Sequence, residues 1–177
     1  NPANHYDCQT GGNPNLSPEK SDTYSIGFVA QPSFLPGLNF SADWFDIKVN
    51  KYIGRIGADV TINKCVTTLD PFFCGLVHRD GAGSIWLSTN GYVKDTTLNT
   101  GSLQTKGVDF NASYRTDLDK FGIDNMGSVN VTFVGTYLKS LETQNLPGDP
   151  YFDCAGLYGT ICSVSGGLTS PNPKWRH

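Results

Sequence analysis

The sequence predicts an all-β chain, and three observations support this fold class. First, glycine, asparagine, threonine and serine together supply 64 of the 177 residues, whereas glutamate, which favours helices, occurs only twice. Second, four stretches alternate apolar and polar residues with the period of two that is typical of β-strands. Third, the connections between these stretches have two very different lengths. Because 38% of the residues are hydrophobic and 12% aromatic, disorder through low hydropathy is excluded.

The four alternating stretches are the expected strands, at residues 21–31, 38–50, 108–114 and 129–137. Their intervening positions are mostly Ser, Thr, Asn or Asp, as on a strand with one polar face. The alternating apolar residues are, in chain order, Tyr24, Ile26, Phe28, Ala30, Leu38, Phe40, Ala42, Trp44, Val108, Phe110, Ala112, Tyr114, Val129, Val131, Phe133 and Tyr137.

Within residues 38–50 the alternation changes phase. Trp44 ends one apolar series, and Phe45, Ile47 and Val49 form the next one. One extra residue at Trp44-Phe45 would produce this shift, so the pattern predicts a β-bulge there.

The connections between the strands indicate a membrane barrel. Residues 31–37 and 116–127 form short or moderate connections, whereas residues 51–100 and 141–173 are long and rich in glycine and asparagine. In an up-and-down antiparallel meander, such alternation puts every long loop at one end, which is the pattern of outer-membrane barrels. Aromatic residues at the strand ends would form the interfacial girdles. A soluble β-sandwich with inward apolar residues stays open, since alternation alone does not separate the two folds.

The five cysteines favour an oxidising compartment. Cys65 with Cys74 and Cys154 with Cys162 have the short separations of loop-closing disulfides, and both pairs lie in the long segments. Cys8 is left over, either as a free thiol or because its partner lies outside this chain. Zinc is the competing interpretation, but the sequence has no CxxC and its three histidines lack ligand spacing.

Several function classes are disfavoured. A net charge of −3, with 13 dispersed basic residues, gives no footprint for nucleic acid. The sequence lacks a run of 18 apolar residues, so no transmembrane helix is expected, although a transmembrane strand is not excluded. His78-Arg79-Asp80 beside Ser84 does not make a catalytic constellation, and the carboxylates of Asp149 and Asp153 are too few for a calcium site. We therefore expect no catalytic residues, no metal and no cofactor.

Aromatic residues in the long segments are the candidate ligand-binding residues. Aromatic faces on tethered loops suit sugars and other ligands with apolar faces, and disulfides would hold such loops in shape. The alternative is that these rings only pack the loops over a barrel mouth. The candidates are Trp86, Tyr92, Tyr151, Phe152 and Tyr158.

Four segments together resemble one known family. Residues 11–28 (GGNPNLSPEKSDTYSIGF), 38–52 (LNFSADWFDIKVNKY), 99–115 (NTGSLQTKGVDFNASYR) and 171–177 (PNPKWRH) occur in an order that resembles the C-terminal half of TonB-dependent outer-membrane receptors. In these segments Pro14 and Pro18 would fix a lead-in loop, and Gly27 and Gly107 would mark a bulge, a bend or a close neighbour.

The resemblance implies a partial arc of a 22-stranded transmembrane β-barrel with long, disulfide-bonded extracellular loops in a bacterial outer membrane. Residues 1–177 would form this one unit, without the plug domain, the TonB box or the remaining strands. The implied function is energised uptake of a scarce large solute, such as an iron chelate, cobalamin or an oligosaccharide. The implied partners are outer-membrane lipid, the solute and, through absent parts, the inner-membrane TonB complex.

An alternative function remains open at this point. A secreted or proteolytically released β-rich protein would act by self-association into fibres or oligomers, because apolar strands with open edges pair with other chains.

Overall fold

The computed structural model describes residues 6–122, 127–159, 162 and 171–177. It divides into two compact units, which are described separately. The first, here called the mixed unit, comprises Asn1–Lys20, Asn50–Ser102 and Asn145–Asp149. The second, here called the strand unit, comprises Ser21–Val49, Leu103–Gln144 and Pro150–His177.

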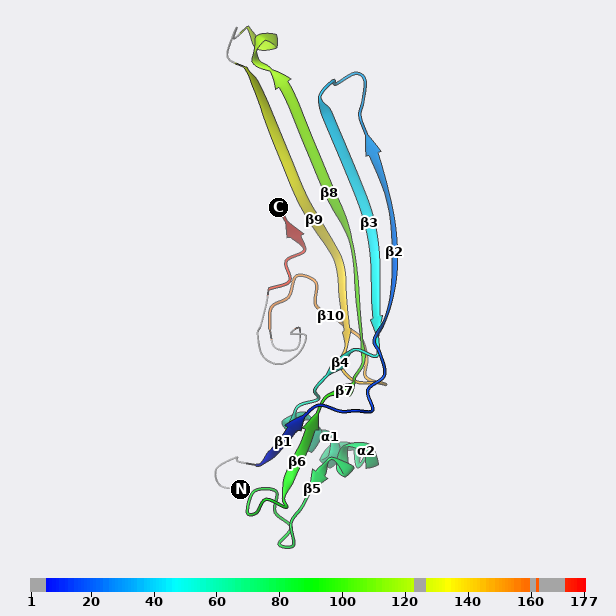
Figure 1. Ribbon diagram of the computed structural model, residues 1–177, viewed down its shortest axis with the longest axis vertical. Helices are drawn as coiled ribbons and strands as arrows, with labels where there is room; N and C mark the ends of the chain where they lie inside the picture. Colours follow the sequence, from blue (N-terminus) through cyan, green and yellow to red (C-terminus); the bar gives the residue numbers. More distant parts are fainter. Residues whose placement is uncertain (1–5, 123–126, 160–161, 163–170) are drawn as a thin grey trace. The chain divides into compact units, whose positions relative to one another are not determined.

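The strand unit is built on one sheet (Figure 1). Its strands are β2 (Lys20–Ala30), β3 (Leu38–Asn50), β8 (Ser102–Asp117), β9 (Ser128–Gln144), β10 (Phe152–Asp153) and β11 (Trp175–Arg176). They are ordered β10-β9-β8-β3-β2, and β11 also pairs with β9, antiparallel to it. Neighbouring long strands run in alternate directions in Figure 1. The four strands expected from alternation are therefore confirmed, and residues 171–177 do begin a further strand.

The two short connections lie at the same end of this sheet, because the strands alternate in direction. Residues 31–37 close the β2–β3 hairpin with a hydrogen bond from the Leu35 N–H to the Pro32 carbonyl of 3.1 Å. Gly37 has a φ of +94°, and any side chain there would collide with the Arg115 carbonyl. The β8–β9 connection contains the 3₁₀ helix η1 (Leu118–Phe121). Both long connections leave from the opposite end, as the loop lengths predict.

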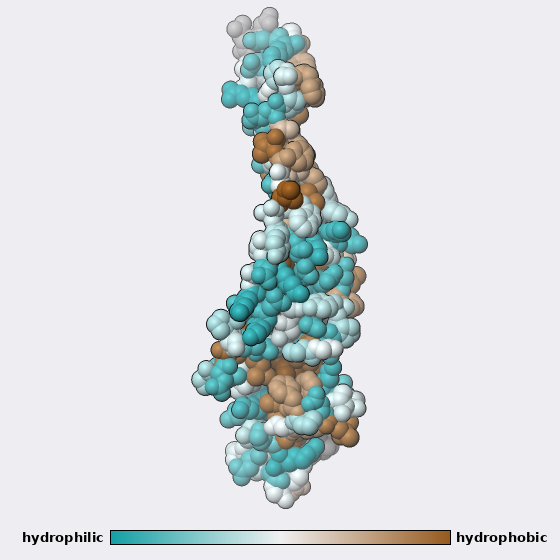
Figure 2. Space-filling model, turned by 90° about the vertical axis from the view of Figure 1, so that its right-hand side faces the viewer, coloured by the Kyte–Doolittle hydropathy of each residue, from teal (hydrophilic) through white to brown (hydrophobic). Residues whose placement is uncertain are grey.

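One face of the sheet carries most of its aromatic residues, and the other carries polar side chains together with Val29 and Val134. On the aromatic face, the Phe28 and Phe40 ring centroids are 5.7 Å apart, and Trp175 lies 5.9 Å from Phe110 and 6.3 Å from Phe133. On the polar face, the Thr136 hydroxyl donates to Asp109 Oδ1 at 2.7 Å. In Figure 2, apolar side chains in the upper part of the strand unit give way to a hydrophilic zone further down.

The register of β3 against β8 shows that the expected β-bulge is wrong. The Arg115 N–H donates to the Gly37 carbonyl, the Phe45 ring lies over Gly107, and Asp46 pairs with Lys106. The backbone pair Ile53–Asn99, which lies beyond the expected bulge, has the same offset as Gly37–Arg115 before it, so no residue is inserted between these positions. The hydrophobic pattern changes phase because the environment of one face changes along β3. On the face that carries Trp44, the next side chain is Asp46, which contacts Lys106 and Gln104 of β8.

The mixed unit contains helices that composition did not predict. Its three-stranded sheet has the order β1-β6-β5, from β1 (Cys8–Gly11), β6 (Tyr92–Thr96) and β5 (Val77–His78). A two-stranded sheet pairs β4 (Ile53–Gly54) with β7 (Leu98–Asn99). The helices are α1 (Ala58–Thr68) and α2 (Pro71–Gly75). Residues 51–100, expected as a loop, therefore form a folded body.

The parallel β1–β6 pair carries the core of the mixed unit. Val93 of β6 is fully buried between Cys8 of β1 and Val77 of β5. Ala58 and Thr61 of α1 pack down towards this strand and are buried, as is Ile85. In the part of the chain that the structure describes, neither helix has the length and apolarity needed to cross a membrane.

Candidate ligand-binding site

The corner between α1 and α2 places Asp70, Phe72 and Phe73, which line one concave surface of the mixed unit. Helix α1 ends at Leu69, which has a left-handed φ of 54° and donates its N–H to the Cys65 carbonyl. Asp70 then caps α2 by accepting from the Phe72 N–H at 2.8 Å, and Pro71 occupies the first helical position, where proline is favoured. The disulfide Cys65–Cys74 ties the two helices together.

Both disulfides expected from cysteine spacing are confirmed. Cys65–Cys74 lies within the mixed unit, and Cys154–Cys162 lies within the strand unit. Cys8 is the free cysteine among the described residues and is exposed. Loss of hydration raises the pKa of its thiol, and the carboxylates of Asp95, Asp59 and Asp7 raise it further. The Cys8 thiol is therefore a weak nucleophile at neutral pH.

Replacing both Cys65 and Cys74 with serine is expected to lower the free energy of unfolding of the mixed unit by about 2.5 to 3 kcal/mol, as chain entropy predicts for a loop of this size. Hydrogen exchange of the α1 amides in the native protein measures this effect. Cys8→Ser is the matched control, because Cys8 closes no loop, and it should leave exchange unchanged. Equal exchange in the double variant and the control would contradict the prediction.

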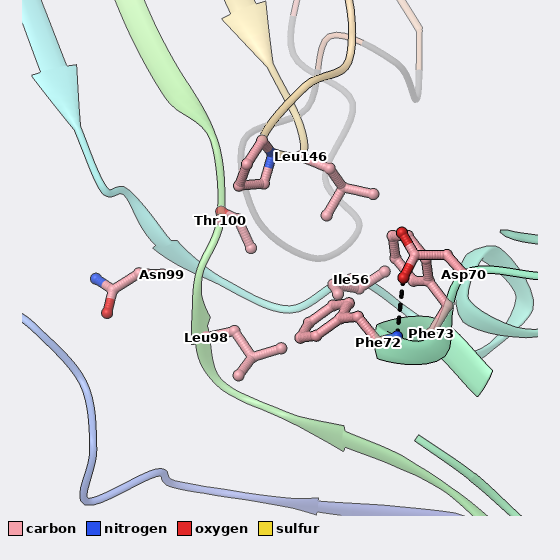
Figure 3. A pocket seen from close by; sticks show the side chains of 9 residues that line it. Ile56, Asp70, Phe72, Phe73, Leu98, Asn99, Thr100 and Leu146 are labelled. Atoms are coloured by element: carbon pink, nitrogen blue, oxygen red, sulfur yellow. Dashed lines mark hydrogen bonds between the residues drawn. The ribbon is translucent and has the colours of Figure 1, made fainter. Parts of the chain in front are cut away.

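An apolar cavity of about 320 Å³ lies beside α2 (Figure 3). Phe72 and Phe73 of α2 face Ile56, Leu98 and Leu146 across it. The remaining lining residues are Asp70, Asn99, Thr100 and Pro147.

The polar groups around this cavity are engaged in local structure. Asn99 points away from the cavity in Figure 3; its amide donates to the Ser17 and Lys51 carbonyls, each at 2.8 Å. The Thr100 hydroxyl donates to the Tyr52 carbonyl at 3.0 Å, and one Asp70 oxygen caps α2. The cavity therefore presents mainly hydrocarbon and aromatic surface.

Leu146 and Pro147 form one wall of the cavity, and the segment 145–149 to which they belong is linked to α1 by an ion pair. Lys64 Nζ and Asp149 Oδ1 are 2.7 Å apart. Leu146 is buried, and its carbonyl accepts from the Asp149 N–H at 3.1 Å. This ion pair, which is only partly exposed, holds the residues that follow β9 against the helix.

A second, more open hollow of about 690 Å³ lies beside α1. Asp59, Ile62, Asn63 and Val66 line it, at the i, i+3, i+4 and i+7 spacing of one helix face. The remaining lining residues are Tyr6, Ile85 and Trp86.

Trp86 is held at this hollow by the loop that follows β5. Ser84 is buried, and its hydroxyl accepts from the N–H groups of Trp86 and Leu87 at 3.1 and 3.2 Å. Gly91 packs against the Ser84 carbonyl so closely that a Cβ would collide with it. The backbone of this loop is thereby fixed, while the Trp86 side chain remains 37% exposed.

Asp80 organises the same loop. Its carboxylate accepts from the Ser84 N–H at 2.8 Å, the Ser88 hydroxyl at 3.0 Å and the Ala82 N–H at 3.0 Å. The Ser84 N–H bond is the largest cause of a lowered pKa for Asp80, the other two donors lower it further, and loss of hydration opposes them.

The lowered pKa of Asp80 gives the loop a defined pH dependence. The charged carboxylate stabilises the loop above the ordinary aspartate pKa of about 3.9, and this contribution is lost as the pH falls through the folded-state pKa. We expect the hydrogen-exchange protection factor of the Ser84 amide to be constant between neutral pH and about pH 5 and to fall severalfold at lower pH. In Asp80→Asn, which keeps an acceptor without charge, this pH dependence should disappear. A protection factor in the variant that still falls with pH would refute the assignment to Asp80.

Tyr6 and Asp59 form a side-chain hydrogen bond across the hollow, with the phenol as donor. This bond raises the pKa of Tyr6 to about 12, helped by loss of hydration and by the charges of Asp59, Cys8 and Asp95. The phenol therefore stays protonated, and one Asp59 oxygen is occupied.

The structure distributes the sequence-predicted aromatic residues between the two units. Trp86 lines the open hollow, whereas Tyr92 lies in β6 with its ring stacked on His78 at 4.5 Å. The other three, Tyr151, Phe152 and Tyr158, belong to the strand unit and are exposed. Phe152 pairs with Thr143 as part of β10. Only Trp86 of the five lines either of the two concave surfaces described above.

Sequence reasoning missed the other lining residues of the open hollow. Tyr6, Asp59 and Asn63 stand far from Trp86 in sequence and carry no motif. The helical spacing of Asp59, Ile62, Asn63 and Val66 was the available signal, but it has meaning only once the segment is known to be a helix.

The strand unit is an antiparallel meander with a folded body between β3 and β8, an arrangement also found in the walls of outer-membrane β-barrels. The sequence profile of the family described as TonB dependent receptor-like, beta-barrel, matches residues 3–175. The chain belongs to this family of outer-membrane transport proteins and receptors. Comparisons with curated proteins and with solved structures found no significant match.

Proposed function

We propose that this chain forms part of the barrel of an active transporter that binds and imports a scarce large solute, such as an iron chelate, cobalamin or an oligosaccharide, with TonB-coupled energy. TonB would act through parts outside residues 1–177. The observation that carries the proposal is the apolar face that β2, β3, β8 and β9 share, which is exposed on β2 and β9 and half-buried on most of β3 and on β8. Ile26 is 73% exposed and Val131 60% exposed, as expected of side chains whose solvent is lipid.

The lipid-facing set would be Tyr24, Ile26, Phe28, Val108, Phe110, Ala112, Val129, Val131 and Phe133. The lumen would be lined by the polar side chains that alternate with them, namely Ser25, Asp109, Asn111, Asn130 and Thr132.

A row of side chains that includes three aromatic residues supports one edge of the membrane band. Trp175 pairs with Tyr137, and the constant registers of the sheet bring Val108 and Trp44 into the same row. Immediately beyond this row, on the same face, Lys106 lies 3.2 Å from Asp46, and Gln104 donates to Asp46 at 2.7 Å. Aromatic residues followed by charged ones are typical of the boundary between hydrocarbon and headgroups.

The long connections would be extracellular, because outer-membrane barrels have short periplasmic turns and long outer loops. The mixed unit would then face the medium, where Trp86, Tyr92, Tyr151, Phe152 and Tyr158 would meet the solute. Tyr92 would contribute one ring face only, since His78 covers the other.

Three measurements test this proposal in cells. Solute uptake should depend on TonB, and the protein should fractionate with the outer membrane. In a Cys8→Ser background, a membrane-impermeant maleimide should label Leu87→Cys on intact cells but label Phe34→Cys only after lysis. These positions are 67% and 86% exposed. Labelling of Phe34→Cys alone on intact cells would reverse the orientation.

A further inference from the structure

We propose that the open hollow beside α1 binds a neutral, polyhydroxylated ligand, namely a segment of an oligosaccharide chain. This inference deepens the proposed function, on which it rests for the presence of such a solute outside the cell. The hollow is lined by Tyr6, Asp59, Ile62, Asn63, Val66, Ile85 and Trp86.

The aromatic component of the site is Trp86. Its indole is 37% exposed, while the backbone on both sides is fixed by Ser84 and by the buried Ile85. A rigid aromatic ring loses little conformational entropy on binding and packs against the apolar C–H face of a sugar ring. Val66, which is 66% exposed, extends the apolar surface along α1.

The polar component lies one turn away on the same helix face. Asn63 is exposed, and its side-chain amide has no hydrogen-bond partner among residues 6–122, 127–159, 162 and 171–177. The Trp86 indole N–H is likewise without a partner in these ranges. Asp59 accepts from Tyr6 through one oxygen. The amide, the indole N–H and the carboxylate supply the donors and acceptors that sugar hydroxyl groups require.

The local charge selects against anions. Asp59 and Asp95 both raise the pKa values of Tyr6 and Cys8, and Asp7 also acts on Cys8, so the field around Tyr6 is negative. The nearest α1 cation on the sequence, Lys64, is paired with Asp149 at 2.7 Å. An anionic iron chelate or a phosphate would meet repulsion here, whereas a neutral sugar would not.

The size and openness of the hollow fit part of a chain. Its volume of about 690 Å³ lies within the usual range for small-molecule sites. Because it opens to solvent, a longer chain can pass through it with only some of its rings in contact. The apolar cavity beside α2 lacks these features, since its polar groups are used in local structure.

The test uses the native full-length protein in detergent, titrated with maltohexaose, cellohexaose and xylohexaose, and separately with ferric citrate and cyanocobalamin. We expect at least one hexasaccharide to bind. Trp86→Ala should weaken that binding about tenfold or more, and Asn63→Ala about three- to tenfold, as loss of an aromatic anchor and of one hydrogen bond predict. Leu87→Ala is the matched control, because Leu87 is exposed next to Trp86 but does not line the hollow; it should change affinity less than twofold.

A second readout separates ligand contact from loop structure. Binding should change the tryptophan fluorescence of the wild type, whereas Trp86→Phe should keep much of the affinity and lose most of that change. Absence of hexasaccharide binding, binding of ferric citrate or cyanocobalamin instead, or equal effects of Trp86→Ala and Leu87→Ala would overturn the inference. These outcomes leave the proposed transport function standing, since that function fails separately, through TonB-independent uptake or absence from the outer membrane.

Discussion

Phe133→Lys is expected to lower the free energy of unfolding of the membrane-inserted protein by about 2 to 4 kcal/mol, the cost of a lysine on the lipid face near the bilayer midplane. Phe133 lies midway along the apolar series of β9, and its ring stacks on Trp175 at 6.3 Å. It is 41% exposed, on the face where Phe110 and Tyr137 also contact Trp175. The substitution would place an ammonium group among these rings and the surrounding lipid.

Asn130→Lys is the matched control on the same strand. Asn130 lies on the opposite face from Phe133, where a charged side chain would point into a hydrated lumen, so the change should cost less than about 1 kcal/mol. Denaturant unfolding of the native protein in lipid vesicles measures both values. Equal costs at the two positions would contradict a lipid-facing assignment and favour a fold in which both faces share one solvent.

The strands were predictable from sequence because this sheet is a single layer of long, regular strands. With a period of two, each side chain's face follows from its position, and no second layer among the described residues disturbs the pattern. The expected stretch at 38–50 corresponds to β3, Leu38–Asn50, and the stretch at 129–137 lies within β9, Ser128–Gln144. Disulfide pairing was equally local, since the sequence separations of the two pairs are only 9 and 8.

The β-bulge was wrongly predicted because the change of phase in hydrophobicity was attributed to an inserted residue. A phase change in hydrophobicity has two physical causes, an inserted residue or a change of solvent along one strand. The constant register from Gly37 to Asp46 selects the second cause. Trp44 ends the apolar series on one face, and Asp46 continues that face as part of an ion pair with Lys106.

Helix α1 escaped prediction because its sequence opposes helix formation locally. Six of its eleven residues are β-branched, and its N-cap, Gly57, has no side chain to cap it. Tertiary interactions compensate: Thr61 is fully buried, and the disulfide Cys65–Cys74 ties the helix to α2. The hollow could not be assembled from sequence, because its residues meet only after α1 packs on the β1–β6 pair.

The isolated segment 1–177, expressed in water without detergent, is expected to form no monomer with a single cooperative unfolding transition. In the strand unit, Ile26 and Val131 on one face and Val29 and Val134 on the other are each at least 60% exposed. Strand β2 also ends the sheet with no hydrogen-bonded neighbour on its outer side among the described residues.

An apolar sheet with an open edge lowers its free energy by pairing with another copy, so oligomers or fibres should form unless lipid or further strands cover it. Sedimentation and denaturant unfolding test this expectation. A monodisperse 19.2 kDa species with one transition would show that the segment is a self-contained soluble β-domain. Soluble fibres in the absence of membranes, together with a native protein that is released from cells, would instead favour action by self-association. Material that unfolds cooperatively only in detergent, and only within the native polypeptide, would agree with a barrel wall that needs both its lipid and its neighbouring strands.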